Sequence, residues 1–445
     1  MESPFVVQIF NKTFQLIGIL GAPVRIEITP RFNAVGTGEI EVSASDPMLD
    51  FMLAKGARCR ITYKGGHEMS GPLLHPSGKV TAFGTVIFQV EDDYRFMPNT
   101  LGWVMPNESI RSSGLLAPTS LSDHAQAWTD TAMEPGLAYG YGYYVFPQSI
   151  DGGMNAFVPS AEAVVKALIT ANMVSRMGRP VTVGANLDRG GNAATAGMLP
   201  SVRMTPLDEA VTALLKWSGL GLSFQHDGIN PTITAEVWEP NTWPLDLTVD
   251  SGVVLDGDWS QQDPTATRVV VGGPGEDVSR AFWDVRDTTG LEAEYGDIIE
   301  VFRDATGASL NWPDALADAY RVAKYYLLRS EVSTTDKNQF TGYLNAAGTK
   351  GLVEGAPTSG LSLTLSETEQ FQYAPGGFRL GDQISVTSNG LTFTDQILAV
   401  TLSINATDGV TVTPQVGNRT DDTDELFARA ISQLAAAQRR LSTNR

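Results

Sequence analysis

Histidines are the first side chains to consider for metal binding or proton transfer, and the chain has four: His67, His75, His124 and His226. A helical zinc site needs the spacing His-Glu-x-x-His, because residues four apart lie on the same face of a helix. No pair of these histidines has that spacing. We therefore expect solvated or turn histidines and predict no metal site.

A second candidate for metal binding is the run Asp256-Gly257-Asp258-Trp259-Ser260, which begins like a calcium-binding loop. Such a loop needs glycine at its sixth position and a bidentate carboxylate at its twelfth. These positions hold Gln261 and Thr267. The sequence therefore argues against an EF-hand.

The glycine-rich run Gly272-Gly273-Pro274-Gly275 follows an apolar strand, as phosphate-binding loops do. No Gly-Lys-Ser/Thr comes after it, and Val278 breaks the dinucleotide fingerprint. The Gly-x-Ser-x-Gly elbow of serine esterases does not occur either. A tight turn explains the run, and we predict no cofactor, no catalytic residue and no enzyme. The 50 acidic residues leave open a carboxylate pair that forms only in three dimensions.

The composition predicts the fold class. A chain of 445 residues is long enough for three or four domains of about 100–200 residues. With 42% apolar and 18% charged residues the composition is that of a globular protein. The 44 glycines and 24 prolines lie among short Val, Ile, Thr and Phe runs, which predicts many turns between strands. We expect a mainly β, multidomain protein with α+β parts.

Charge and cysteine content restrict the partners and the compartment. The formal net charge of -19 argues against affinity for nucleic acid or anionic membrane, since both need a surplus of Lys and Arg. The single Cys59 excludes an internal disulfide and fits folding in a reducing cytoplasm, where we expect it to pack in a strand. Residues 1–4 lack the basic start of a signal peptide, and the apolar patch 14–20 is too short to span a bilayer. We expect no export signal and no membrane anchor.

Periodicity along the chain predicts five segments. Residues 1–105 read as a β-module, and residues 106–159 as an irregular insertion. Residues 160–345 mix helices with strands, which favours a central α+β domain. Residues 346–418 form a second β-module, and residues 419–445 a C-terminal helix.

Three helices are expected in the central domain. The first begins after a capping Ser160 and keeps an apolar face as far as Met173. The second has Thr205 in a capping position and Gly219 past its end. The third is predicted over residues 313–329.

The two ends of the chain share a faint repeat. A glycine, Gly56 or Gly381, opens each copy, an alternating strand follows, and Gly65 or Gly390 marks the turn at the same distance. A second strand then returns. On spacing alone, any two hairpins of a β-rich chain could share this pattern. The alternative is one module used twice.

The C-terminal helix carries a narrow apolar seam with 4-3-4-3 spacing. Such a seam packs on its own domain, on symmetry mates or on a further protein. Its residues are the candidate oligomer and partner contacts: Phe427, Ile431, Leu434, Gln438 and Leu441.

A series of short runs resembles a family of minor tail proteins in actinobacterial siphophages. They follow one another in patches over most of the chain, with the stretch 106–159 outside the pattern. In chain order they are Pro30-Arg31-Phe32-Asn33, Gly38-Glu39-Ile40-Glu41-Val42, Asp46-Pro47, Ser70-Gly71, Asp92-Asp93-Tyr94-Arg95, Arg268-Val269-Val270-Val271-Gly272-Gly273, Tyr295-Gly296-Asp297-Ile298-Ile299-Glu300, Leu380-Gly381-Asp382 and Val416-Gly417.

The resemblance implies a baseplate hub, or tail-associated protein, at the tail tip of a virion assembled in the host cytoplasm. Such hubs have two tube-like β-domains per subunit, so that a homotrimer presents six modules to a sixfold tube. The implied partners are the distal tail protein, the tape measure protein and further minor tail proteins. Genome DNA would pass through without specific binding.

Two alternatives remain open. One is a cell-wall hydrolase at the tail tip, which the missing catalytic motifs disfavour. The other is a receptor-binding protein that holds host glycans with the aromatic residues Trp128, Tyr139, Tyr141 and Tyr143.

Overall fold

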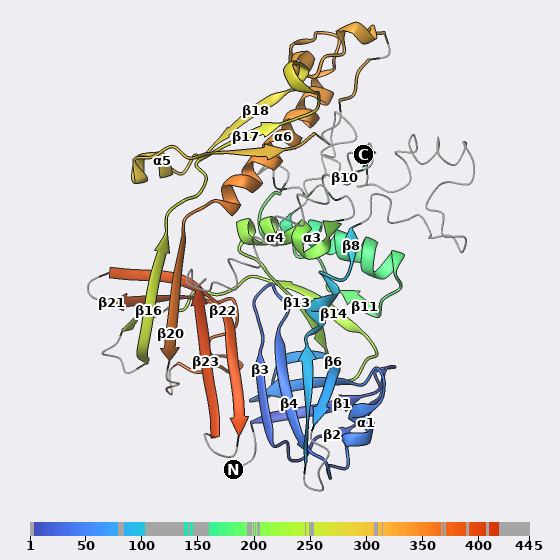
Figure 1. The fold of residues 1–445 in the computed structure, drawn as a ribbon, viewed down its shortest axis with the longest axis vertical. Helices are drawn as coiled ribbons and strands as arrows, with labels where there is room; N and C mark the ends of the chain where they lie inside the picture. Colours follow the sequence, from blue (N-terminus) through green and yellow to red (C-terminus); the bar gives the residue numbers. More distant parts are fainter. Residues whose placement is uncertain are drawn as a thin grey trace, which may run out of the picture.

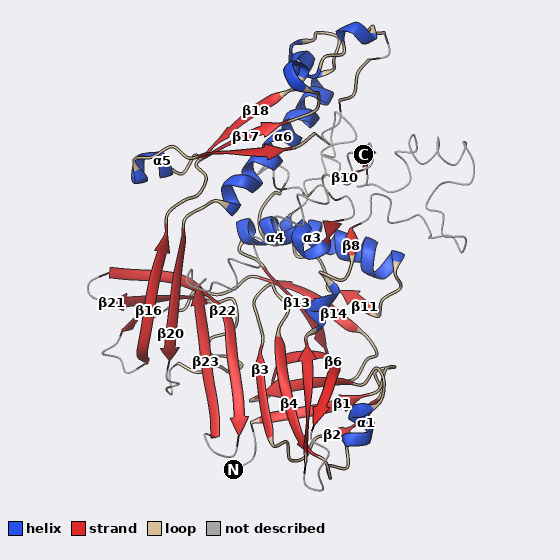
Figure 2. Cartoon of the chain, in the orientation of Figure 1, coloured by secondary structure: helices blue, strands red, loops and turns tan. Residues whose placement is uncertain are grey.

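The protein folds into a large β-structure with two smaller bodies that contain its helices (Figures 1 and 2). The computed structural model describes residues 4–78, 84–102, 138–140, 143–145, 160–193, 198, 200, 202, 205–244, 246–248, 253–306, 310–313, 315–365, 368, 371–388, 391–405 and 409–417. Three hydrophobic clusters lie within this part of the chain. The expected mainly β, multidomain fold with α+β parts is confirmed.

The N-terminal module is an antiparallel sheet in the order β3-β4-β7-β6-β5-β1-β2. In β3, Ile26 and Ile28 are buried while the residues between them are partly exposed, so that one face of the sheet is apolar. Helix α1 (Leu49–Leu53) connects β4 to β5. The strands are β1 (Phe5–Phe10), β2 (Leu16–Ile19), β3 (Arg25–Thr29), β4 (Thr37–Ser43), β5 (Arg58–Tyr63), β6 (Gly66–Gly78) and β7 (Thr85–Glu91).

The C-terminal module has the order β16-β20-β23-β22, with β21 paired to the first half of β22 and β15 paired in parallel to β21. Both modules contribute to the first hydrophobic cluster, in which Ile28 and Leu402 are fully buried. Because β22 also pairs with β3, the two modules form one thirteen-stranded sheet. The strands are β15 (Leu247–Thr248), β16 (Val254–Gln262), β20 (Thr358–Leu365), β21 (Gln383–Ser388), β22 (Leu391–Asn405) and β23 (Gly409–Gly417).

The second body is α+β and covers one end of the N-terminal module (Figure 1). Its helices α3 (Ala161–Ile169), continued by a π-helical turn, and α4 (Leu207–Ser218) pack on the sheet β11-β14-β13. Ser160 caps α3 as expected, since its hydroxyl accepts from the Ala163 N–H at 3.2 Å. Gly219 ends α4 at φ 68°, also as expected. These strands are β11 (Val181–Val183), β13 (Gly221–His226) and β14 (Ile233–Trp238).

The predicted cap of α4 is wrong. Thr205 lies in the short strand β12 (Thr205–Pro206), which pairs with β8 (Leu101–Gly102), and no side chain caps the helix. The backbone of Thr205 is used for strand pairing with Gly102, so it does not adopt the role of a cap.

The third body lies between β16 and β20 in sequence and at the opposite end of the molecule from the N-terminal module (Figure 1). Its sheet has the order β18-β17-β19, and the long helix α6 (Thr334–Glu354) packs on one face through Phe340 and Leu344. A short helix, α5 (Leu291–Tyr295), precedes β19. The strands are β17 (Arg268–Gly272), β18 (Phe282–Arg286) and β19 (Glu300–Asp304).

The helix predicted over residues 313–329 is wrong. This stretch forms two short 3-10 turns, Asp318–Tyr320 and Ala323–Leu328. The buried Tyr326 hydroxyl donates to the Asn311 carbonyl at 3.0 Å, so a side chain directed into the core holds the loop in place of helical hydrogen bonds.

Candidate assembly interface

The strand order confirms the repeat that the glycine spacing had suggested. In the N-terminal module β4, β7, β6 and β5 are consecutive neighbours, and in the C-terminal module β20, β23, β22 and β21 are neighbours in the same order. Gly56 and Gly381 both have positive φ, at 81° and 89°, and each lies two residues before its strand. The two ends therefore contain one module twice.

The long strand of each module is bent in the same way. Strand β6 pairs first with β5 and then with β7, and β22 pairs first with β21 and then with β23. A bulge follows Leu74 in β6 and Ile397 in β22. A bulge adds one residue and turns the strand, which lets one strand belong to two layers of its module.

The junction between the modules is a short antiparallel ladder. It runs from Leu402 opposite Ile28 to Asn405 opposite Arg25. The hydroxyls of Thr29 and Thr401 lie 3.1 Å apart beside it. Such a ladder holds the modules through backbone hydrogen bonds and sets their relative register.

Phe32 fixes the same junction from the side. Its N–H donates to the Leu398 carbonyl at 2.8 Å. Its ring lies against Gly381, where a Cβ atom would be only 2.4 Å from Cε2 of the ring. The glycine that opens the second module is thus required both by its positive φ and by contact with the first module.

Several strand edges of the large sheet remain open in the part of the chain that the structure describes, including that of β2, which pairs with β1 alone. Strand β16 pairs there with β20 alone, and the segment Leu73–Gly78 of β6 pairs with β7 alone. Residues 75–78 are exposed. An open strand edge offers unpaired N–H and C=O groups to another strand.

A buried polar network connects the N-terminal module to the α+β body. The Arg58 guanidinium pairs with Asp93, whose side chain is fully buried, and the Ser70 hydroxyl donates to Asp93 Oδ2 at 2.8 Å. The His226 N–H on β13 donates to the Ser70 oxygen at 3.3 Å. Arg60 Nε donates to the His226 carbonyl at 2.8 Å. These contacts fix the α+β body on β5 and β6.

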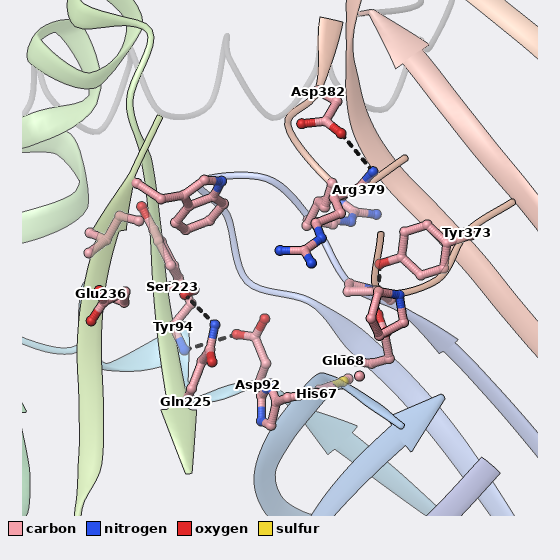
Figure 3. A pocket seen from close by; sticks show the side chains of 18 of the residues that line it. His67, Glu68, Asp92, Tyr94, Ser223, Gln225, Glu236, Tyr373, Arg379 and Asp382 are labelled. Carbon is pink, nitrogen blue, oxygen red and sulfur yellow. Dashed lines mark hydrogen bonds between the residues drawn. The ribbon is translucent and has the colours of Figure 1, made fainter. Parts of the chain in front are cut away.

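A cavity of about 540 Å³ lies where the two modules meet the α+β body (Figure 3). The Tyr373 hydroxyl donates to Glu68 Oε2 at 2.6 Å across it. Burial raises the pKa of Glu68 and of Asp92 to about 8, and lowers the pKa of His67 to about 3. All three side chains are therefore neutral near pH 7, which suits hydrogen bonding between domains, and we assign no catalytic step to them.

The structure separates the residues that the sequence singled out for chemistry. His226 lies between the rings of Phe10 and Phe14, at centroid distances of 4.7 and 5.2 Å. Asp256 and Asp258 belong to strand β16, so they form no calcium loop. Among the described residues no group of three His, Cys, Asp or Glu is placed to hold a metal ion.

The glycine run after β17 is a turn, as expected. Gly275 has φ 101°, and the Arg280 guanidinium donates to the carbonyls of Gly272 and Gly273. Cys59 is buried in β5, where burial raises the pKa of its thiol to about 12. No helix among the described residues is long and apolar enough to cross a bilayer.

The predicted contact residues of the C-terminal helix, Phe427 to Leu441, lie outside the described residues and stay a prediction. So do Trp128 and Tyr141 of the aromatic alternative. Tyr139 and Tyr143 lie in two short paired strands, β9 (Ala138–Gly140) and β10 (Tyr143–Val145). The junction itself was missed in the sequence, because a four-residue ladder between distant strands leaves no local pattern.

Among solved structures, the chain is similar to several tail proteins. The 43 kDa tail protein of prophage MuSo2 from Shewanella oneidensis matches over 93% of this chain and 97% of its own, at 11% identity and a TM-score of 0.44. The tail protein from Neisseria meningitidis MC58 matches over 93% of this chain and 96% of its own, at 12% identity and a TM-score of 0.45. Prophage tail protein gp18 from Listeria monocytogenes EGD-e matches over 97% of this chain and 99% of its own, at 8% identity and a TM-score of 0.46.

No curated protein matches the chain. The match to a protein family spans residues 6–112 and 152–418 and so includes both β-modules, the α+β body and the third body. The chain belongs to the family of Siphovirus ReqiPepy6 Gp37-like proteins.

Proposed function

We propose that the protein is the hub of a phage tail tip, a structural subunit that closes the distal end of the tail tube as a trimeric ring. The observation that carries this proposal is the duplicated module: two copies with the same strand order stand side by side in one sheet. Three such chains supply six modules, which matches a sixfold tube.

The open edges support closure of the ring. Within the chain, β3 of the first module pairs with the second half of β22 in the second. By strand order the counterparts are β16 in the second module and the second half of β6 in the first, and both of these edges are open among the described strands. Repeating the internal junction between copies is a head-to-tail contact, which forms a ring when its rotation closes.

The roles proposed for the α+β body and the third body follow from their positions in the fold. The α+β body is fixed to the first module, and the third body projects from β16 and β20 away from the sheet (Figure 1). Both are available to contact other tail proteins, for which we propose the distal tail protein, the tape measure protein and further minor tail proteins. We propose no enzymatic activity.

Imaging of the assembled particle tests the hub directly. We expect three copies around the tail axis at the tip, with each chain contributing two adjacent modules to one ring. Copies placed at the periphery of the tail would contradict the proposal. In addition, zymography with purified protein is expected to leave host peptidoglycan intact, and reproducible clearing would favour the hydrolase alternative.

A further inference from the structure

The segment between β20 and β21 packs on the N-terminal module beside the junction. The Tyr373 ring lies 6.3 Å from the Tyr63 ring of β5, measured between centroids, and the Tyr373 hydroxyl donates to Glu68 of β6. Phe378 of the same segment is 1% exposed in the core that the two modules share. The second module therefore holds the first through this segment as well as through the β22–β3 ladder.

Helix α1 is the counterpart of this segment in the N-terminal module. It lies between β4 and β5, as residues 371–382 lie between β20 and β21. Leu53 and Phe378 both lie three residues before the opening glycine of their module. Phe378 is buried, whereas Leu53 is 47% exposed and Phe51 on the same helix is 50% exposed. Within the described part of the chain, these two side chains lack the cover that Phe378 receives.

The counterpart of Glu68 in the C-terminal module is an aromatic residue. Glu68 and Phe393 both lie twelve residues after the opening glycine of their module. Phe393 stacks on Trp259 of β16, with 4.9 Å between the ring centroids, and Trp259 is 53% exposed. The acceptor of Tyr373 is thus polar at the internal junction, whereas the equivalent place at the open edge of β16 presents a pair of aromatic rings.

Helix α1 and the aromatic pair lie at opposite sides of the joined modules. In Figure 1, α1 is on the side of the N-terminal module that faces away from the C-terminal module. Strand β16, which carries Trp259, is the last strand at the other end of the sheet. One chain therefore does not bring the two surfaces together, whereas a second copy placed head to tail does.

We infer that Phe51 and Leu53 of α1 dock on the Trp259–Phe393 pair of a neighbouring copy of the chain. The inference rests on the proposed hub and names the side chains that join its subunits. The contact continues the pairing of β6 with β16 between copies, as residues 371–382 continue the β22–β3 ladder within one chain. Both surfaces are apolar, so their removal from water favours the contact.

Cysteine cross-linking tests this contact in assembled tails. Pro375 lies six residues before Gly381 and packs on Gly66, where a Cβ atom would be 3.2 Å from its Cγ. The residues at the equivalent positions are Asp50 and Leu391. We expect D50C/L391C to form a disulfide between copies, because the two Cα atoms come within the reach of a disulfide. Covalent dimers and trimers would appear on a non-reducing gel.

A matched control uses the same first cysteine with a second one far from the contact. Thr411 is exposed on β23 and pairs with the second half of β22, away from Leu391. D50C/T411C is expected to give no cross-link between copies. The native Cys59 is buried in β5, so it does not compete. Equal cross-linking of the two double variants, or none from D50C/L391C in assembled tails, would overturn the inference.

Substitutions on α1 give a second, independent readout. F51D/L53D places two charges on the exposed side of the helix and is expected to lower incorporation of the protein into tails several-fold. F51L/L53M keeps both side chains apolar and is expected to be incorporated normally. Equal incorporation of both variants would contradict the docking of α1. The hub proposal is judged separately: three copies around the tail axis without the D50C/L391C cross-link would leave the hub intact and refute only this contact.

Discussion

The Tyr373 hydroxyl donates a 2.6 Å hydrogen bond to Glu68, which joins the strand β6 of the first module to the segment that precedes β21 in the second. Both side chains border the cavity at the meeting point of the domains (Figure 3). The contact between modules is therefore polar at this point as well as apolar in the shared core. Burial raises the pKa of Glu68, so the protonation of this contact depends on pH.

The first prediction concerns stability against pH. Burial raises the pKa of Glu68 from 4.5 to about 8 and that of Asp92 from 3.8 to about 8. The folded state then holds protons that the unfolded chain has lost, so the contribution of these two carboxyls to the free energy of unfolding falls as pH rises from about 4 to about 8. The lowered pKa of His67 acts in the opposite direction below about pH 6.5, so the contribution of Glu68 is read from the difference between wild type and variant. Urea unfolding at several pH values measures this slope. E68Q is expected to reduce it and E209Q to preserve it, and an unchanged slope in E68Q would refute the assignment.

The second prediction concerns the buried pair of Arg58 and Asp93. Their side chains are 12% and 0% exposed, so removing the carboxylate leaves an uncompensated buried cation. We expect D93A to cost about 3–5 kcal/mol of unfolding free energy. The exposed pair of Arg25 and Glu27 is the control, for which E27A is expected to cost at most about 1 kcal/mol. Chemical denaturation gives both values, and a similar cost for the two variants would contradict the prediction.

The third prediction concerns the helix that the sequence predicts over residues 419–445. If Phe427, Ile431, Leu434, Gln438 and Leu441 contact symmetry mates or the next tip protein, deletion of residues 424–445 weakens tail assembly. L434D within the seam is expected to do the same, and A436D outside the seam to have little effect. Counting of intact tails by electron microscopy measures the outcome. Normal assembly after the deletion would show that these residues are not needed as assembly contacts.

Sequence patterns predicted the features that depend on residues close together in the chain. The positions of Ser160 and Gly219 marked helix ends that the structure has. The repeated glycines Gly56 and Gly381 pointed to the duplicated module. Each of these signals is carried by residues close in the chain.

Features that depend on long-range contacts left no such signal. The β22–β3 junction joins segments more than 370 residues apart, as the bond between Thr29 and Thr401 shows. The cavity collects Glu68, Asp92 and Tyr373 from three separate segments. Helix α6 was missed for a different reason: its sequence is polar and contains several glycines, so it has no strong apolar stripe.

Those glycines lead to the last prediction. In an exposed helix interior, replacing glycine by alanine stabilises by about 1 kcal/mol, because alanine has the higher helix propensity. Gly348 of α6 lies against the sheet, where a Cβ atom would be 2.3 Å from Cγ2 of Val285. We therefore expect G348A to destabilise by about 1–3 kcal/mol, since the helix must move away from β18. Adding V285A should recover much of the loss, as measured by thermal or urea unfolding. Stabilisation by G348A alone would show that α6 does not pack this closely on β18.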